Sequence, residues 1–433
     1  MSSLGEAGCF AYYFNILASK AAMAPAFFEK APYTSTVFLL LATGLSIVAN
    51  KLLLKTIDLQ FSEQAGDREA LLTRLPEQRE SVLNLPFLVQ ISAPKTLEGD
   101  ILYFLVLVVE QIALLRLTAI WVIFLYDFTK DFPGWGGLIF LLLAGSSFIS
   151  FPEMQGLQVL CVGLNVVYAV SNSMINSNIQ LNSEGTEWKN ELNFAEFGVI
   201  TLFVVNHIIV PSVLAASAVS TARQSQLQTL AVVLGAALSL VLGLFIPRNE
   251  GMNKEGVFLY VRGLLFVPCA FSWLQIRMRT LVEVVTAWRY GLNVHVARKR
   301  YPYRVKIVQI CLPVIVALPC FILPYLDVST QNLMFDVIAL PQELTLAISI
   351  ILLIIPWCYD WTVQGFSGNV DLKRVPEWWR YVAYVGGGCS LLASIYSFTQ
   401  VDDSTTLWYS LYLDCGLVGG MVVWQVLGNY LGN

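Results

Sequence analysis

The stretch Tyr103–Phe128 reads YFLVLVVEQIALLRLTAIWVIFLYDF, and it decides the class of fold. A helix of ~20 mostly apolar residues is long enough to cross a bilayer, and this stretch exceeds that length. It nevertheless carries Glu110 and Arg116, and a charged side chain costs ~2.5–3.5 kcal/mol at the centre of a membrane. The stretch therefore predicts a transmembrane helix whose charged positions are enclosed by other helices and not by lipid.

The composition of the whole chain agrees with a membrane protein. Hydrophobic residues make up 56% of its 433 residues and charged residues 13%, against about 45–50% and about 25% in soluble domains. The net charge of −4 gives no sign of a nucleic-acid partner. The two histidines and the singly placed cysteines do not form the clusters that haem and most zinc sites need, so we expect no metal and no other cofactor.

Apolar runs of spanning length recur along the chain. We expect about eleven transmembrane helices, within a range of 10–12, because the runs are continuously apolar and an open strand edge cannot exist in lipid. The predicted fold is an all-α, polytopic helical bundle without a soluble domain. The expected spans are 35–54, 101–126, 134–151, 155–176, 195–219, 227–246, 256–275, 306–326, 333–356, 380–398 and 406–430.

The predicted organisation is an N-terminal segment followed by one membrane domain. Residues 1–34 contain an apolar run that Lys20 interrupts, which favours a surface-lying or re-entrant helix over a cleavable signal peptide. Residues 35–433 form the membrane domain. Its long connector, 55–100, mixes charged and apolar residues at helical spacing, as expected of an amphipathic helix on the cytoplasmic surface of the membrane.

The loop 276–306 is strongly basic, and the excess of arginine and lysine places it in the cytoplasm. An odd number of spans then puts the N-terminus outside and the C-terminus in the cytoplasm. If residues 1–34 also cross the membrane, the N-terminus moves inside. No repeat is visible in the residues, and an odd number of spans argues against a five-plus-five duplication unless an extra helix is appended.

Amides in the expected span 155–176 share one face of the helix. Gln158, Asn165, Asn172 and Asn176 are separated by seven, seven and four residues, and these steps bring them back to similar helical angles. Such a stripe either holds helices together through hydrogen bonds or lines a hydrated path for a polar ligand. Both readings are open from the sequence.

Proline residues predict two interrupted helices. Pro211 removes the amide that would bond the carbonyl of His207, so a kink should lie beside an imidazole, the side chain that titrates most readily near neutral pH. Pro341 lies between Asp336 and Glu343. It should free the carbonyl of Val337, and carboxylates beside a broken helix are typical of proton and cation sites in transporters.

These features predict a transporter that moves a polar or charged solute by alternating access, with proton or cation coupling. Its expected solute and ion site consists of Glu110, Arg116, Asn165, Asn172, Asn176, His207, Asp336 and Glu343. No hydrolase, phosphate-binding or prenyl-transfer motif is present, so we assign no catalytic residue. Two alternatives stay open: a membrane-embedded enzyme that uses carboxylic acids on a lipid or isoprenoid, and a non-catalytic subunit that binds other membrane proteins.

Overall fold

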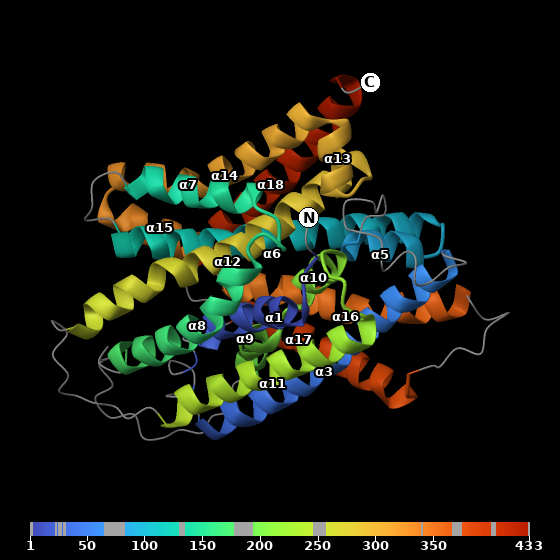
Figure 1. Ribbon diagram of the computed structural model, residues 1–433, viewed down its shortest axis with the longest axis horizontal. Helices are drawn as coiled ribbons and strands as arrows, with labels where there is room; N and C mark the ends of the chain where they lie inside the picture. The colour runs from blue at the N-terminus through green and yellow to red at the C-terminus, as the bar shows by residue number, and fades with distance from the viewer. Residues whose placement is uncertain are drawn as a thin grey trace.

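The computed structural model describes residues 3–21, 24, 28, 32–64, 83–129, 135–176, 194–245, 257–338, 341–365, 375–399 and 404–431. Within these ranges the regular structure is helical, apart from one isolated bridge between Leu4 and Ser217 (Figure 1). The helices are α1 (Glu6–Ala21), α3 (Pro32–Gln64), α5 (Leu85–Ser92), α6 (Leu97–Thr129), α7 (Trp135–Phe148), α8 (Gln155–Asn176), α9 (Ala195–Val204), η2 (His207–Ile209), α10 (Val210–Ala215), α11 (Thr221–Phe245), α12 (Val257–Tyr290), α13 (Val294–Arg300), α14 (Pro302–Ile322), η3 (Leu323–Tyr325), α15 (Val328–Ile338), α16 (Pro341–Gly365), α17 (Glu377–Phe398) and α18 (Ser404–Leu431).

The all-helical, multi-pass fold predicted from the sequence is confirmed. Among the described residues, eight helical segments are long and apolar enough to cross a membrane. Two of the expected spans appear as shorter apolar helices, Ile139–Phe148 and Gln155–Ser171. The run 256–275 forms the first part of the 34-residue helix α12.

The helices pack as two groups of five that repeat each other's contacts. The first group consists of α1, α3, α6, α7 and α8. In the second group α9 and α10 together form the first member, and the other four are α11, α12, α14 and α16. Helix α1 packs on α11 as α9 packs on α3, and α8 packs on α12 as α16 packs on α6. The pairs α6–α12, α7–α14 and α3–α11 join equivalent members of the two groups. The packing of the helices therefore contains a repeat that is not visible in the amino-acid sequence. Helices α17 and α18 come after the second group in the chain.

Neighbouring helices enclose α1, which lies near the centre of the view in Figure 1. It packs against α8, α9, α11 and α12, and most of its side chains are buried, including Tyr12, Tyr13 and Asn15. A helix lying on the membrane surface would keep one face exposed. The sequence-based expectation of a surface-lying helix within residues 1–34 is therefore inconsistent with this packing, and Lys20 is carried into the interior.

Helix α12 continues past the predicted end of its span. The sequence placed the basic loop at 276–306, whereas α12 runs on to Tyr290. Arg277 is 2% exposed and Arg279 is 1% exposed, so these two residues belong to the interior and not to a solvated loop. The continuous connector expected at 55–100 falls partly outside the described residues, and its described end forms α5 and the start of α6.

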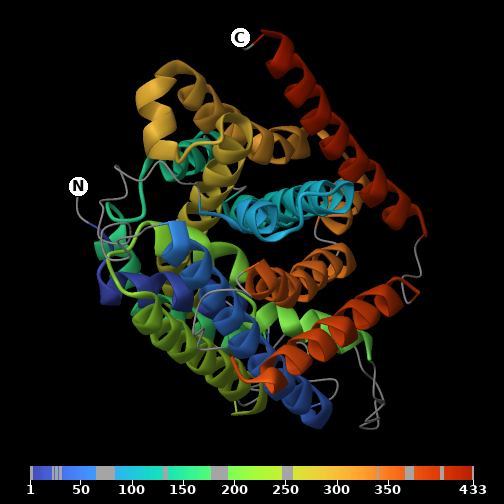
Figure 2. The same cartoon turned by 90° about the vertical axis from the view of Figure 1, so that its right-hand side faces the viewer.

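Helix α18 lies at the outside of the bundle (Figure 2). Its most extensive packing within the described residues is against α15, and it exposes large apolar side chains such as Trp408, Tyr412 and Val423. Apolar surface of this kind is expected where a helix faces lipid.

We predict that Gly235→Val destabilises the protein because α1 and α11 approach closely at that position. A Cβ atom added to Gly235 would lie 2.8 Å from Cβ of Leu17, and overpacking of this kind costs about 1–3 kcal/mol. The midpoint of thermal unfolding of the detergent-purified chain should fall. The matched control is Gly163→Val on α8, where nothing lies within 4 Å of the added Cβ; equal shifts for the two variants would contradict the prediction.

Candidate functional site

The fifth expected span is interrupted in its middle. Helix α9 ends at Val204, residues 205 and 206 are not helical, and the 3-10 turn η2 leads into α10. Pro211 lies at the start of α10, where its missing amide is tolerated. The kink predicted from Pro211 is thus confirmed. The expectation that the carbonyl of His207 is free is wrong, because this carbonyl accepts from the amide of Val210. The carbonyls that lack a helical amide donor are those at the end of α9.

The carbonyls at the end of α9 are satisfied by side chains from neighbouring helices. The ammonium of Lys20 on α1 donates to the carbonyls of Leu202 and Val205, both at 2.7 Å. The hydroxyl of Ser46 on α3 donates to the carbonyl of Val204 at 2.6 Å. The C-terminal end of a helix carries partial negative charge, so a lysine ammonium is favourable there.

Amides from α3 and α11 fix the other side of the break. Asn50 donates to Oδ1 of Asn206 at 3.2 Å, and Gln228 donates to the same oxygen at 3.1 Å. Oδ1 of Asn50 lies 2.7 Å from Nδ1 of His207. Since that oxygen can only accept, Nδ1 carries the proton and the neutral ring has its lone pair on Nε2. Nε2 is buried and has no hydrogen-bond partner within the described chain.

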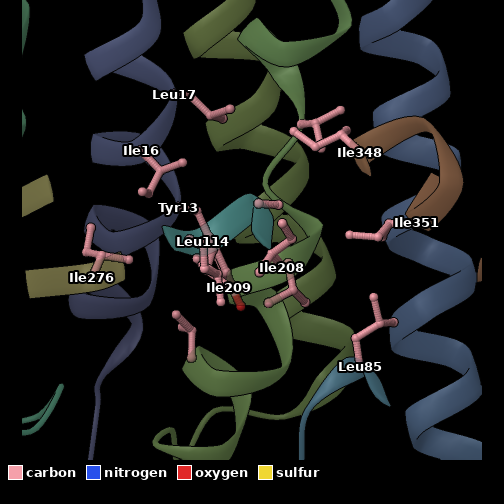
Figure 3. Packing of buried hydrophobic residues seen from close by; sticks show 14 of the residues in the cluster. Tyr13, Ile16, Leu17, Leu85, Leu114, Ile208, Ile209, Ile276, Ile348 and Ile351 are labelled. Carbon is pink, nitrogen blue, oxygen red and sulfur yellow. The ribbon is translucent and has the colours of Figure 1, made fainter. Parts of the chain in front are cut away.

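A cavity of about 30 Å³ lies beside the break, which is room for about two water-sized groups. Figure 3 shows its apolar side, with Ile16 of α1, Leu114 of α6, Ile208 and Ile209 of η2 and Ile348 of α16 around the η2 segment. Its polar lining comprises Lys20, Asn206, His207 and Arg277. None of the described residues that line this cavity is acidic.

The amide stripe on α8 joins three helices. Asn165 donates to Asn15 of α1 at 3.0 Å, and Asn15 donates to the side chain and the carbonyl of Gln158. Gln158 in turn donates to Gln275 of α12 at 3.2 Å and accepts from Ser272. These amides bond to one another, as expected of contacts that hold helices together. The side chains of Asn172 and Asn176 lie outside the described residues.

Arg116 and Glu343 belong to a separate ion cluster. The guanidinium of Arg116 is 2% exposed; it pairs with Glu343 and donates to Asp414 of α18 at 2.8 and 3.0 Å. It also donates to the carbonyl of Val337 at 3.1 Å, which is the carbonyl predicted to be freed by Pro341. Hydrogen bonds from Ser410 to Val337 and Glu343 complete the cluster. It contains two carboxylates and one guanidinium.

The residues predicted for one site therefore divide among several places. Asp336 is exposed on α15, whereas His207 lies at the break of α9. Glu110 is 1% exposed and its Oε2 has no hydrogen-bond partner in the described part of the chain. It precedes Leu114, a cavity-lining residue, by one turn of α6, so both point to the same side of that helix.

Sequence reasoning missed Lys20 and Arg277 as cavity residues. In the sequence, Lys20 interrupts an N-terminal apolar run, and Arg277 lies within the expected basic loop. The sequence does contain a signal for Lys20. A charged residue inside the apolar run 7–28 indicates an enclosed position, just as Glu110 does inside its own apolar run. Arg277 offered no such signal, since it adjoins a true cluster of basic residues.

The sequence matches no protein-family model and no curated protein. The structure, however, resembles solved membrane transporters. A mutant of the Eremococcus coleocola manganese transporter superposes with a TM-score of 0.50 at 12% identity, covering 97% of this chain and 92% of that chain. MhsT in complex with L-phenylalanine gives a TM-score of 0.47 at 14% identity over 89% of this chain and 98% of that chain. Mhp1, a nucleobase-cation-symport-1 family transporter, gives 0.45 at 12% identity over 95% and 96%.

These likenesses concern the fold. The chain has the multi-pass fold of the manganese transporter, which is the LeuT type of arrangement. At this level of identity a shared fold does not carry over a bound solute. Among the described residues, moreover, no three His, Cys, Asp or Glu side chains come together as a metal site.

We predict that Arg116→Met destabilises the protein because it leaves Glu343 and Asp414 enclosed without their cation. Removing one partner of a buried ion pair costs about 3–5 kcal/mol, and the two carboxylates would then also repel each other. The measurement is thermal unfolding of the purified chain. Arg223→Met is the matched control, because Arg223 pairs with Glu6 at the exposed surface; a similar effect in both variants would refute the assignment.

Proposed function

We propose that this protein is a secondary transporter that carries a small polar or charged solute through the cavity at the break of α9. The observation that supports this most is the interrupted helix itself. Its backbone carbonyls and a buried imidazole adjoin a small cavity inside a fold shared with a transporter. Discontinuous helices near the middle of the membrane form the solute and ion sites of many transporters.

A second cavity supports a path from this site toward the basic side of the protein. It measures about 40 Å³ and is lined by Ser212 and Ala216 near the end of α10, together with Arg279, Glu283 and His295. The η2–α10 segment therefore has one cavity at each end. Arg279 donates to Glu283 at 3.1 Å beside the second cavity, so an ion pair must be rearranged or bypassed if solute leaves there.

The two groups of five helices supply a mechanism for alternating access. Five crossings bring a chain to the opposite side of the membrane, so two such groups run in opposite directions. Rocking of one group against the other would open the cavity to one side and then to the other. Helices α6 and α12, which contact each other across the two groups, each contribute a wall of the cavity through Leu114 and Arg277.

The proposed orientation keeps α13, which carries Arg298, Lys299 and Arg300, in the cytoplasm. The C-terminus then lies in the cytoplasm. The N-terminus lies outside if α1 does not cross the membrane and inside if it does. The repeat in the packing, where α1 takes the place of α9, supports a crossing.

A lipid-modifying enzyme would require a carboxylic acid facing its substrate. The described lining of the cavity beside α9 holds basic and neutral side chains instead, so this alternative has less support. For ion coupling, Glu110 is the stronger candidate among the predicted acids, because Glu343 is engaged by Arg116 and Ser410. An enclosed carboxyl without an ion pair can gain and lose a proton during a transport cycle.

We predict that Leu117→Trp blocks solute uptake. Leu117 lines the cavity, and an indole in its place would fill a space of about 30 Å³. Uptake by proteoliposomes, screened over a panel of small anions, cations and neutral solutes, should fall to the level of empty vesicles. Leu105→Trp is the matched control on the same helix, because Leu105 is 42% exposed; uptake that survives Leu117→Trp would place the solute elsewhere.

We further predict that Glu110→Gln removes the dependence of uptake on pH. The amide resembles the protonated carboxyl in shape but cannot release a proton. With a pH gradient as the driving force, accumulation should be lost, whereas exchange of solute at equal pH should persist. Accumulation that responds to pH as in the unaltered chain would exclude Glu110 from coupling.

A further inference from the structure

The carbonyl end of α9 has the chemistry of a site for a monovalent cation. A helix leaves its last carbonyls without amide donors, and this end carries partial negative charge. The carbonyls of Leu202, Val204 and Val205 all accept hydrogen bonds from side chains of other helices. Carbonyls at the ends of interrupted helices coordinate sodium ions in transporters.

The cation at this position belongs to the protein itself. The ammonium of Lys20 donates to the carbonyls of Leu202 and Val205 at 2.7 Å each, which is at the short end of the range for a charged donor. Two carbonyls from the same break thus converge on one nitrogen, as they would on an ion. Lys20 reaches them from α1, so its side chain connects α1 to the end of α9.

We propose that Lys20 is a built-in substitute for a coupling cation: its ammonium occupies a cation site at the carbonyl end of α9, so the protein works without a free sodium or potassium ion. The consequence for coupling rests on the proposed transport function. A cation that is tethered to α1 cannot cross the membrane with the solute. A gradient of sodium or potassium therefore does not drive uptake.

The ligands of the ammonium suit a monovalent ion. They are neutral backbone oxygens, and rings of such carbonyls are sufficient to hold an ion of single charge. Among the described residues, no three His, Cys, Asp or Glu side chains gather as a metal site. The position therefore does not have the carboxylate ligands that divalent ions prefer.

The surroundings allow a free ion to replace the tethered one. Lys20 and Val205 both line the cavity of about 30 Å³ beside the break, and Lys20 is half-buried. Truncation of the lysine at Cβ would extend this cavity up to the two carbonyls. The trimethylammonium group of choline is bulkier than sodium or potassium and has no N–H donor, so choline serves as the inert cation.

The alternative role for Lys20 is that of a cap, which only satisfies the last carbonyls of a helix by hydrogen bonds. Any small group with N–H donors would replace a cap. A cation site would also accept an ion that has charge but no N–H. Sodium and potassium therefore distinguish the two roles.

The test compares Lys20→Ala with Lys20→Met in the full-length chain, purified in lipid nanodiscs. Alanine leaves a space that sodium or propylammonium can enter, and propylammonium replaces the atoms removed from the lysine. Methionine fills the same space with an uncharged chain. The midpoint of thermal unfolding is measured in the chlorides of sodium, potassium, propylammonium and choline at equal ionic strength.

We expect sodium or potassium to raise the midpoint of Lys20→Ala above its value in choline, by about 1–2 °C at ten times the dissociation constant. The unaltered chain and Lys20→Met should show the same midpoint in sodium, potassium and choline. Lys55→Ala is the matched control: Lys55 lies on α3 and pairs with Asp58, and its removal should create no response to sodium or potassium.

Two results would overturn the inference. If sodium or potassium stabilises the unaltered chain relative to choline, the protein still takes up a free cation. If neither ion stabilises Lys20→Ala, the lysine is only a hydrogen-bonding cap, and this conclusion holds even where propylammonium stabilises the variant. Should Lys20→Ala not fold, the response of the unaltered chain to the same salts decides the matter.

Uptake by proteoliposomes separates this inference from the proposed function. If sodium stabilises Lys20→Ala but the unaltered chain takes up no solute, the cation site stands and the transport function falls. If solute is taken up, its uptake should be equal in sodium, potassium and choline at the same pH. Uptake driven by a sodium gradient would overturn the inference and leave the transporter in place.

Discussion

The interruption of α9 at residues 205 and 206 is the constraint on which the rest of this structure depends. A helix that stops inside a membrane leaves carbonyl groups that lipid cannot satisfy. Here the bonds come from two different helices, through Lys20 of α1 and Ser46 of α3. Gln228 of α11 bonds the side chain of Asn206 within the break. The break therefore fixes how these helices sit around α9, and it makes α1 a buried central element.

A second backbone carbonyl is also bonded by a buried cation, with a different outcome. The carbonyl of Val337, near the described end of α15, accepts from Arg116, as the end of α9 accepts from Lys20. At that position Glu343 and Asp414 surround the cation, so the charge is compensated by the protein itself. Such a cluster holds α6, α16 and α18 together and has no evident need for a ligand.

Sequence patterns predicted the class of fold and the interruption beside His207, because these features are local. The interruption expected at Pro341 falls next to residues 339 and 340, which lie outside the described residues. Length and hydropathy identify a spanning helix, and Pro211 or Pro341 removes a defined hydrogen bond wherever it occurs. The sequence-based expectation that Glu110, Arg116, Asn165, His207, Asp336 and Glu343 form one site was not reliable in the same way, and the structure separates them. Helical angles show which residues share a face, but the partner of each face depends on how the two groups of five helices pack. Thus Asn165 meets Asn15, and Arg116 meets Asp414, across 150 and 298 residues of sequence.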